Sequence, residues 1–548
     1  MKKILRHSKM VILNLITGLT SALTGHLTEI LATLALIFFL IYIWLQYQYS
    51  YWRRHKVPYI EPALIFGNLK GIIKSEADPV TWFQYLYNHE KAKNHSAVGI
   101  YIFNKPSLLI RNIELVKSVL IKDFNSFSNR HSSSDPHSDS IGSDNLFFMK
   151  NPKWKEIRVK LTPVFTSGKM KQMFPLVEEI AREYDKYLCA LEVDPKTNST
   201  VIEVKEGNSL YTTDVIAITA FGLKANSLND PNGIFRKSGK EMFYFTWFRS
   251  IEFKAFFFLP ILVKICGFKV FSKQASIFLR NMINDVIAER IRTGNVRNDL
   301  IDILVKFKIE AEEELKQGKK PYMLERDVLP AQAAIFFSAG FETSASTMSF
   351  IMYEMARHPE VQQRLREEIY EVWQSNNGKV SYEMLSDLKY MDNVIKEVLR
   401  HYPPLSFLDR VCTPKVGEEG YSLKPFGIDF IVPENMPVFV PIQALHMDPK
   451  NFKDPKKFDP DRFLPENKDD NNMNAYMPFG TGPHNCIGER FAMVQTKLGL
   501  LYFYRNHYVT ACEKTPKQIQ FDPLAIIIQS KGGIHVNIVR EPLFGDSI

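Results

Sequence analysis

An uncharged apolar stretch near the amino terminus is the first clear feature of the hydropathy pattern. Residues 30–45 carry no charge, and tyrosines and tryptophans crowd the end of the stretch, up to Trp52. With Leu27 and the tyrosine-rich end included, it reaches the about 17–25 residues that span a bilayer. Aromatic side chains at one end are typical of the membrane–water interface. The pattern predicts one membrane helix rather than a cleaved signal peptide, because no small-residue cleavage site follows.

The charges that flank this segment leave its orientation open. Arg53, Arg54 and Lys56 follow it directly, but four basic residues also precede it within residues 1–9. Residues 1–26 form an extension whose semi-apolar stretch, 11–23, can be interpreted with or without membrane insertion. No internal repeat or low-complexity linker divides the rest of the chain. Residues 1–52 are therefore predicted to be extension and anchor, and residues 53–548 one globular domain.

Helical periodicity dominates the remaining chain. Apolar residues recur at helical spacing in four clear segments, residues 170–188, 277–290, 328–357 and 359–374. β-Branched residues mixed with Pro and Gly predict short strands in three others, residues 98–110, 404–443 and 520–540. Residues 129–144 lack periodicity and predict a loop. The fold class predicted is mainly α with small β-sheets, preceded by a single membrane helix.

Composition and charge narrow the chemistry. The 548 residues are 45% hydrophobic and include 40 phenylalanines, which suits a large apolar interior, although core packing alone explains such a count. The net charge of +9 suits an anionic membrane or an acidic partner. The basic residues form no dense run of the kind that binds nucleic acid. Five cysteines without a C-x-x-C pair favour a reducing compartment, with one cysteine committed to a ligand.

The candidate ligand cysteine is Cys486, within residues 479–491, which read Phe-Gly-Thr-Gly-Pro-His-Asn-Cys-Ile-Gly-Glu-Arg-Phe. It precedes an apolar helical pattern, and a thiolate at a helix N-terminus gains from unpaired backbone N–H groups. Gly480, Gly482 and Gly488 can adopt positive φ and admit a large planar ligand. Such a thiolate suits haem iron, on which it favours O–O cleavage. A buried free cysteine is the alternative for a cysteine considered alone. A nucleotide-binding loop is excluded, since no G-x-G-x-x-G opens a helix.

Three further patterns carry candidate chemistry. Trp154 and Arg158 stand at i, i+4, where an indole N–H and a guanidinium suit a carboxylate. Residues 339–344 place a glycine beside Glu342 and Thr343 within a helix. A hydroxyl there can bond the backbone four residues back and open a groove, in which Glu342 and Thr343 would deliver protons to oxygen. Glu397 and Arg400, at i, i+3, form an ion pair that is exposed on most helices. Each pattern alone also has an ordinary structural interpretation.

Taken together, these motifs resemble the cytochrome P-450 superfamily of haem-thiolate monooxygenases, in family order from Trp154 to Phe491. The resemblance implies haem b on Cys486 beside Phe479 and Gly488, propionates on Trp154, Arg158 and Arg410, and an oxygen-activation motif of Ala339, Gly340, Glu342 and Thr343. It implies that Glu397 and Arg400 are buried and completed by Arg462, as support for folding and the haem loop. Within the superfamily the chain most resembles the microsomal clan of vertebrate drug-oxidising and insect xenobiotic-metabolising members.

One residue departs from the family pattern. Where the family usually has arginine two positions before the ligand cysteine, this chain has His484. A histidine can donate to a propionate, but it is shorter and mostly neutral near pH 7. We therefore expect His484 to contact the haem less tightly than arginine would.

The resemblance also implies a reaction and partners. Iron-bound dioxygen would be reduced with NADPH electrons supplied by a separate flavoprotein reductase, with cytochrome b5 as a second candidate donor, because no nicotinamide or flavin motif is visible. A microsomal member would be anchored in the endoplasmic reticulum membrane with its catalytic domain in the cytosol, without nucleic acid as a partner. Substrates would be apolar small molecules of xenobiotic, lipid, steroid or terpenoid type. By family position the pocket walls would include Phe336, Phe337, Leu405, Phe407 and Ile526.

Two other functions share most of these features. A haem-thiolate isomerase or dehydratase of oxidised lipids would use the same cofactor without external electrons, but it has no need of Thr343. The intact Glu342–Thr343 pair beside an intact Cys486 thiolate argues against a non-catalytic haem or apolar-ligand binding protein.

Overall fold

A computed structural model describes residues 10, 29–297 and 299–544. The predicted mainly α fold with small sheets is confirmed. The helices that build the body are α4 (Pro79–Asn88), α7 (Lys153–Leu161), α8 (Ser167–Cys189), α9 (Val204–Ile216), α10 (Ile234–Phe243), α11 (Trp247–Phe258), α12 (Pro260–Cys266), α13 (Lys273–Thr293), α14 (Leu300–Lys316), α15 (Val328–Arg357), α16 (Pro359–Ser375), α17 (Lys389–His401) and α19 (Glu489–Asn506). Shorter helices are α2 (Tyr51–Arg54), α3 (Lys70–Ile73), α5 (Ile113–Lys117), α6 (Ser140–Ser143) and α18 (Ile442–His446).

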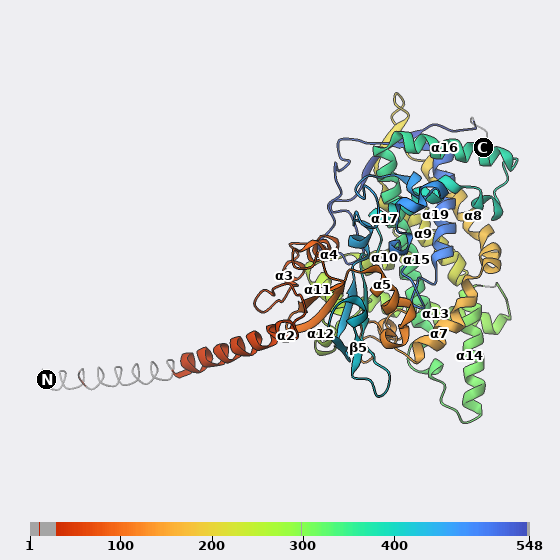
Figure 1. The fold of residues 1–548 in the computed structure, drawn as a ribbon. Helices are drawn as coiled ribbons and strands as arrows, with labels where there is room; N and C mark the ends of the chain where they lie inside the picture. Colours follow the sequence, from red (N-terminus) through yellow and green to blue (C-terminus); the bar gives the residue numbers. More distant parts are fainter. Residues whose placement is uncertain (1–9, 11–28, 298, 545–548) are drawn as a thin grey trace, which may run out of the picture.

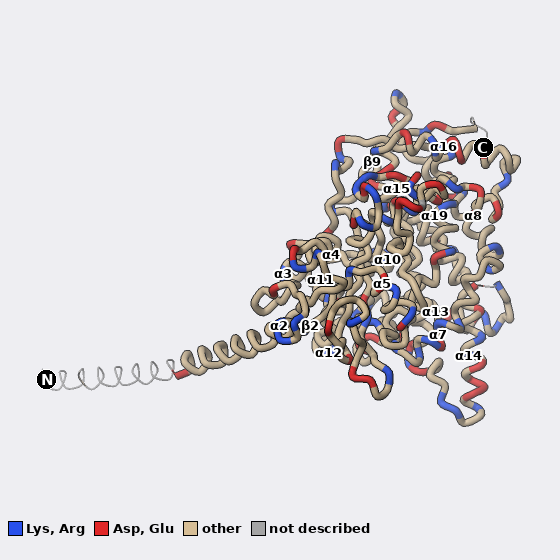
Figure 2. The backbone as a smooth tube through the Cα atoms, in the orientation of Figure 1, with Lys and Arg blue, Asp and Glu red and all other residues tan. Residues whose placement is uncertain are grey.

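The predicted membrane helix is present as Glu29–Tyr49, which is 21 residues long, has a mean hydropathy of 2.1 and is long and apolar enough to cross a membrane. It projects away from the body of the molecule (Figure 1). Beyond Glu29 its described part carries no charged residue, whereas α2, at its junction with the body, is basic (Figure 2). The semi-apolar stretch 11–23 lies outside the described residues.

Three small sheets lie at the side and end of the helical body. The largest has the order β1-β2-β7-β4, formed by Ala97–Ile102, Lys105–Ile110, Pro437–Val440 and Leu408–Val411. Strands β1 and β2 pair antiparallel, which confirms the sheet predicted in residues 98–110. Strand β7 joins them in parallel and holds β4 at the edge, with Val438 opposite Arg410. The other sheets are β3-β9-β8 (Ser199–Glu203, His535–Arg540, His507–Thr510) and β5-β6 (Gly420–Ser422, Ile431–Pro433).

Helix α15 runs through the centre of the body. It is apolar on every side and rich in small residues, so it can be enclosed by α9, α13, α17 and α19. Its bounds agree with the prediction for residues 328–357, and α16 ends one residue beyond its predicted segment. Pro359 stops the first helix and starts the second, because proline lacks the N–H that a helix interior needs but suits a first turn.

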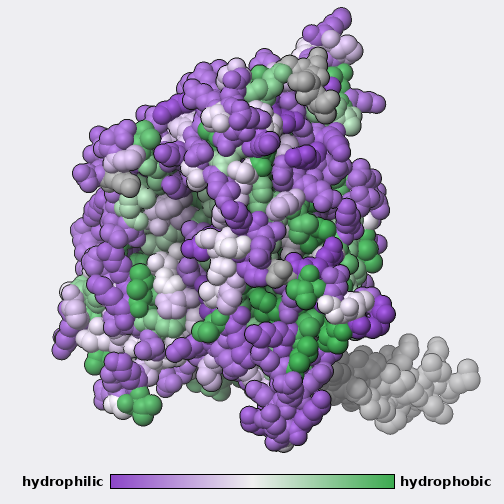
Figure 3. Space-filling view, turned by 90° about the vertical axis from the view of Figure 1, so that its right-hand side faces the viewer, coloured by the Kyte–Doolittle hydropathy of each residue, from purple (hydrophilic) through white to green (hydrophobic). Residues whose placement is uncertain are grey.

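The face turned away from the membrane helix is mostly hydrophilic, with apolar residues scattered over it (Figure 3). In contrast, large apolar side chains are exposed on α11 and α12, at the end of the body where the membrane helix joins it (Figure 1): Trp247 and Phe248, and Ile261 and Ile265. The phenylalanines at the end of α11, Phe256 to Phe258, are buried core. Helix α11 thus begins with exposed aromatic side chains and ends with buried ones.

Candidate active site

The loop before α19 presents Cys486 to an internal cavity. The backbone N–H of Cys486 donates to the carbonyl of Phe479 at 2.8 Å, which closes the loop. Gly480 and Gly482 have φ of 70° and 72°, and a Cβ on Gly482 would lie 2.0 Å from the Leu120 carbonyl oxygen. Both positions therefore require glycine. Gly488 has a negative φ of −93° and is the N-cap of α19, so the expectation of positive φ holds for two of the three glycines.

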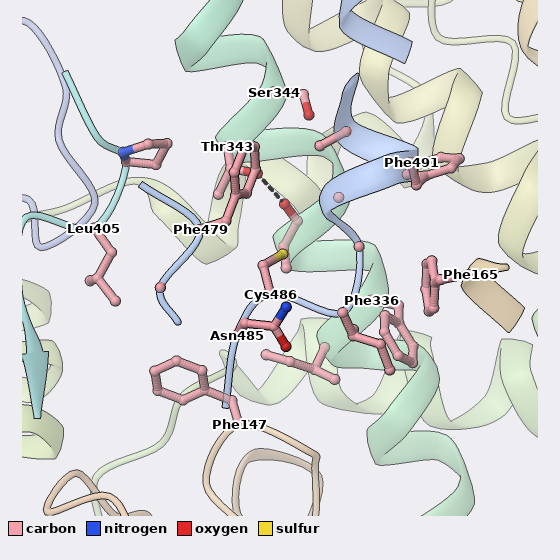
Figure 4. Close-up of a pocket in the computed structure, with 18 of the residues that line it drawn as sticks. Phe147, Phe165, Phe336, Thr343, Ser344, Leu405, Phe479, Asn485, Cys486 and Phe491 are labelled. Carbon is pink, nitrogen blue, oxygen red and sulfur yellow. Dashed lines mark hydrogen bonds between the residues drawn. The ribbon is translucent and has the colours of Figure 1, made fainter. Parts of the chain in front are cut away.

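Cys486 is the one cysteine among the described residues that lines this cavity. In Figure 4 its sulfur lies at the centre of the view, with Thr343 of α15 on one side and Phe147 on the other. Burial raises the pKa of the Cys486 thiol, and the backbone N–H of Gly488 opposes this in part. Without a metal the group is therefore a neutral thiol, and the helix N-terminus alone does not ionise it.

The walls of the cavity are mainly apolar and come from distant parts of the chain. They include side chains from the segments before and after α7, from α15, from β4 and the segment before it, and from the cysteine loop and α19: Leu146, Phe147, Val164, Phe165, Ile335, Phe336, Leu405, Leu408, Phe479, Ile487 and Phe491. A mainly apolar cavity of this kind suits a large, flat, apolar group.

One end of the cavity is strongly basic. Arg130, Trp154, Arg158 and His484 line it, and the Arg158 guanidinium donates to Asn485 Oδ1 at 2.7 Å. Arg410, on β4, is 1% exposed and is not itself a lining residue. Burial and the nearby Arg130 lower the pKa of Arg410 to about 9. The Nε atoms of Arg130 and Arg410 are buried without a hydrogen-bond partner in the described chain.

The carboxylate nearest to this cluster is that of Asp409. It is 1% exposed and accepts a hydrogen bond from the backbone N–H of Ser132 at 2.7 Å. Burial alone would raise its pKa, but Arg130, the Ser132 N–H, His131 and Arg410 together outweigh burial and lower it. One carboxylate cannot balance several guanidiniums, and buried donors without partners are costly. The cluster thus fits a ligand that brings further carboxylates.

These observations fit haem. An iron porphyrin is flat and apolar, carries two propionates, and would meet the thiol of Cys486 and the basic end of the same cavity. Arg130 was missed by the sequence reasoning because it lies in a segment without periodicity, residues 129–144, where no spacing rule applies. Its only signal in the sequence is a basic residue within an otherwise hydroxyl-rich loop.

His484 does not make the contact expected of it. Its Nε2 lies 2.8 Å from the carbonyl oxygen of Ser128, so the neutral ring donates its single N–H there. The ring lies against Trp154, with centroids 3.7 Å apart and ring planes tilted by 37°. Burial and the nearby arginines lower the pKa of His484, which keeps the ring neutral. The expectation that the neutral ring donates to a propionate is therefore corrected: its free nitrogen, Nδ1, is an acceptor.

Thr343 faces the cavity from α15, together with Ala339 and Gly340. Its hydroxyl donates to the Ala339 carbonyl at 2.7 Å, which is the predicted bond to the residue four positions back. The Gly340 carbonyl accepts from Gln495 of α19 at 2.9 Å. The helix is nevertheless not interrupted at Gly340, because α15 is continuous from Val328 to Arg357.

Glu342 is directed elsewhere. It is 3% exposed, does not line the cavity, and accepts from Lys205 at 2.6 Å and from Gln529 at 3.0 Å. Successive residues of an α-helix point about 100° apart, so an acid and an alcohol that are neighbours in sequence cannot face one cavity equally. This corrects the expectation that both side chains reach the oxygen site.

Glu397 and Arg400 are completely buried, as the resemblance implied. The Arg400 guanidinium forms two hydrogen bonds of 2.8 Å to the two oxygens of Glu397. The Nε of Arg462 lies 3.5 Å from Glu397 Oε1, which also accepts the Asp459 backbone N–H at 2.9 Å. Burial would raise the pKa of Glu397, but its bonds from Arg400 and His401 outweigh it and lower the pKa to about 2.

The predicted substrate walls divide into two groups. Phe336 and Leu405 line the cavity. Phe337, Phe407 and Ile526 do not, and each is at most 1% exposed. Phe337 follows Phe336 on α15 and so turns away, toward Phe341. Phe407 stacks on Phe258 within the core.

Comparison with known proteins agrees with this geometry. Residues 57–536 match the family model described as Cytochrome P450. The chain is 50% identical over 504 residues to a Drosophila melanogaster protein named "Probable cytochrome P450 6g2", which covers 91% of this chain and 96% of that protein. It is 38% identical over 526 residues to "Cytochrome P450 6k1" of Blattella germanica, covering 94% and 97%.

Proposed function

Because the chain belongs to the cytochrome P450 family and is a monooxygenase of that family, we propose that it inserts one atom of dioxygen into an apolar small molecule of xenobiotic, lipid, steroid or terpenoid type. The second oxygen atom leaves as water. The observation that carries this proposal is the shared cavity, in which the Cys486 thiol and the Thr343 hydroxyl face apolar walls that include Phe336 and Leu405. These walls exclude water and favour an apolar guest.

The family cofactor is haem, which when bound supplies the iron at which dioxygen is activated. Cys486 Sγ would ligate that iron and lose its proton on doing so. Arg130, Arg158, Arg410 and the indole of Trp154 would hold the propionates through charge-assisted bonds. Phe479, Gly488, Ala339 and Gly340 would pack near the ring as parts of the cysteine loop and of α15.

Thr343 is the residue of this chain that we assign to proton delivery. Its Oγ1–H is shared with the Ala339 carbonyl, and the same oxygen can accept a proton from water in the cavity while it passes its own on. Glu342 would have to leave Lys205 and Gln529 before it could reach the cavity, so a direct role for its carboxylate rests on a rearrangement. As long as these two contacts are kept, Glu342 is a structural partner of Lys205.

Glu397, Arg400 and Arg462 are assigned to support rather than to chemistry. They tie α17 to residues 453–462, the segment that leads toward the cysteine loop, through hydrogen bonds that reach Asp459 and the Lys453 carbonyl. None of the three lines the cavity, as far as the described residues show.

The electron source and the cellular site complete the proposal. Electrons would come from NADPH through a separate flavoprotein reductase, with cytochrome b5 as a second donor, since the sequence holds no nicotinamide or flavin motif. The helix Glu29–Tyr49 would anchor residues 53–548 to the endoplasmic reticulum membrane, with this domain in the cytosol. Basic residues stand on both sides of the helix, so this orientation rests on the microsomal members of the family rather than on charge.

A reduced carbon-monoxide difference spectrum of the full chain tests the central assignment, because an axial thiolate shifts the haem band distinctively. We expect the thiolate band in the native protein and in Cys189→Ala, a matched removal of another cysteine. Cys486→Ala should lose that band together with oxygen insertion. A thiolate band that persists in Cys486→Ala would refute the proposal.

A further inference from the structure

A second pocket lies beside the junction of the membrane helix with the body. It has a volume of about 680 Å³. Gln48 of the membrane helix lines it, as do Pro260 and Ile261 of α12. We call it the basic pocket, because its polar side includes Lys105, Arg130, His131 and Lys150 with Asn129 and Asn435. Apart from Arg130, its residues are separate from those of the active-site cavity.

Neither lysine of the basic pocket forms an ion pair with a carboxylate among the described residues, although Asp409 acts on Lys150 from a greater distance. Lys105, at the start of β2, makes no side-chain hydrogen bond or ion pair within the described part of the chain, and burial alone lowers its pKa. Lys150 donates to the backbone carbonyls of Arg130 and Ser132 at 2.5 and 2.6 Å. An ammonium group has three N–H donors, so one remains for another acceptor. Burial lowers the pKa of Lys150 to about 8, which still leaves it mostly charged at neutral pH.

His131 supplies a second, independent sign of a missing ligand. Its Nε2 is buried without a hydrogen-bond partner among the described residues. Most buried polar atoms in proteins are satisfied, so an unsatisfied nitrogen beside a cavity marks a place where a further group is expected. The nearby Asp409 does not supply it, because its charge already offsets that of Arg130 and its Oδ2 accepts from Ser132.

Part of the lining of the basic pocket is apolar and leads to an exposed apolar surface. Phe258, Leu259, Pro260 and Ile261 form that part. Ile261 and Ile265, both on α12, are 62% and 70% exposed. Figure 1 shows α12 next to α2, where the membrane helix meets the body, and Figure 2 shows basic residues at α2 and β2. A cationic recess and an apolar surface thus adjoin at the level where a bilayer would end.

We propose that the basic pocket binds the phosphate of an anionic membrane phospholipid, with its acyl chains along the apolar surface of α12. Lys105 and Lys150 neutralise the phosphate, His131 and Asn435 bond its oxygens, and Ile261 contacts the glycerol end of the chains. A soluble phosphate ester offers the same charge, but it would leave the apolar wall uncovered. The position of Gln48, within the membrane helix itself, favours the lipid.

The test uses the full chain in nonionic detergent micelles, titrated separately with phosphatidic acid, phosphatidylcholine and glycerol 3-phosphate, and bound lipid is counted by native mass spectrometry. We expect one tightly bound phosphatidic acid. Lys105→Gln should weaken it about five-fold, the factor that corresponds to about 1 kcal/mol for one lysine at an anionic surface. Asn435→Asp, which adds a negative charge in a residue that tolerates the observed φ of 62°, should weaken it as well.

Lys56→Gln is the matched control. Lys56 is exposed directly after α2, close to the membrane helix, but does not line the basic pocket. The Lys56→Gln substitution should leave phosphatidic acid binding unchanged. Equal binding in the native protein and Lys105→Gln would overturn the proposal, and so would an equal loss in Lys56→Gln, which would show general attraction to the surface. Glycerol 3-phosphate that binds as tightly as phosphatidic acid would overturn the lipid assignment. Because the lysines lie outside the active-site cavity, these results are independent of the carbon-monoxide spectrum.

Discussion

Replacing Glu397 by glutamine tests whether the buried ion pair holds the domain together. Glutamine keeps the size of the side chain but removes the charge, and it leaves Arg400 fully buried without its carboxylate. Removing one partner of a buried pair costs about 3–5 kcal/mol, because the other charge stays desolvated. The pKa of Glu397, lowered from the ordinary 4.5 to about 2 chiefly by Arg400 and His401 against the effect of burial, has the sign expected of a carboxylate that stabilises the folded state.

The sign of the pH dependence follows from the same shift. A carboxyl group whose pKa is lowered by folding stabilises the folded state above its unfolded pKa, near 4.5, and loses that contribution as the pH falls toward 2. The difference in unfolding free energy between the native protein and Glu397→Gln should therefore be constant from pH 6 to pH 8. It should shrink below about pH 4.5.

Urea unfolding followed by tryptophan fluorescence measures this difference. Glu289→Gln is the matched control, because Glu289 and Arg292 have the same i, i+3 spacing and two hydrogen bonds but are exposed. We expect no measurable change for Glu289→Gln, since solvent screens exposed pairs. The reasoning is refuted if Glu397→Gln unfolds at the same urea concentration as the native protein, or if the two variants lose equal stability.

Three further predictions concern the cavity, the cysteine loop and the topology. Thr343→Ala should leave substrate binding largely intact but divert reducing equivalents to hydrogen peroxide; unchanged coupling of NADPH use to product would contradict the role of Thr343. His484→Ala should release haem to apomyoglobin several-fold faster, because Trp154 loses the ring packed against it and the Ser128 carbonyl loses a hydrogen bond worth about 1 kcal/mol; equal release rates would show that Trp154 is held by other contacts. The sequons at Asn94 and Asn198 should stay unglycosylated in microsomes if the domain is cytosolic, and glycosidase-sensitive mass at either would reverse the orientation.

Local patterns in the sequence were sufficient for α15 and α16, and they single out Cys486 as the candidate ligand. The bounds of α15 and the start of α16 follow from apolar periodicity and from Pro359, since both act within one or two helical turns. The glycines before Cys486 can likewise be predicted from the local sequence, because a positive φ or a close approach of another backbone segment excludes other residues. The spacing of Glu397 and Arg400 predicted a pair, and the family resemblance rather than the spacing predicted its burial.

The direction in which a side chain points was decided only by the tertiary structure. Phe336 faces the cavity, whereas Phe337 faces the core. In the same way Thr343 faces the cavity, whereas Glu342 pairs with Lys205. Neighbouring residues of a helix point about 100° apart, and packing decides which of them faces the cavity. Arg130 joins the cavity through a loop without periodicity. The N–H of His484 goes to a carbonyl 356 positions away in the sequence. Such partners come from segments that are remote in sequence, so no pattern within either segment specifies them. The physical reason is that hydrogen bonds and burial depend on distance in space rather than on distance along the chain.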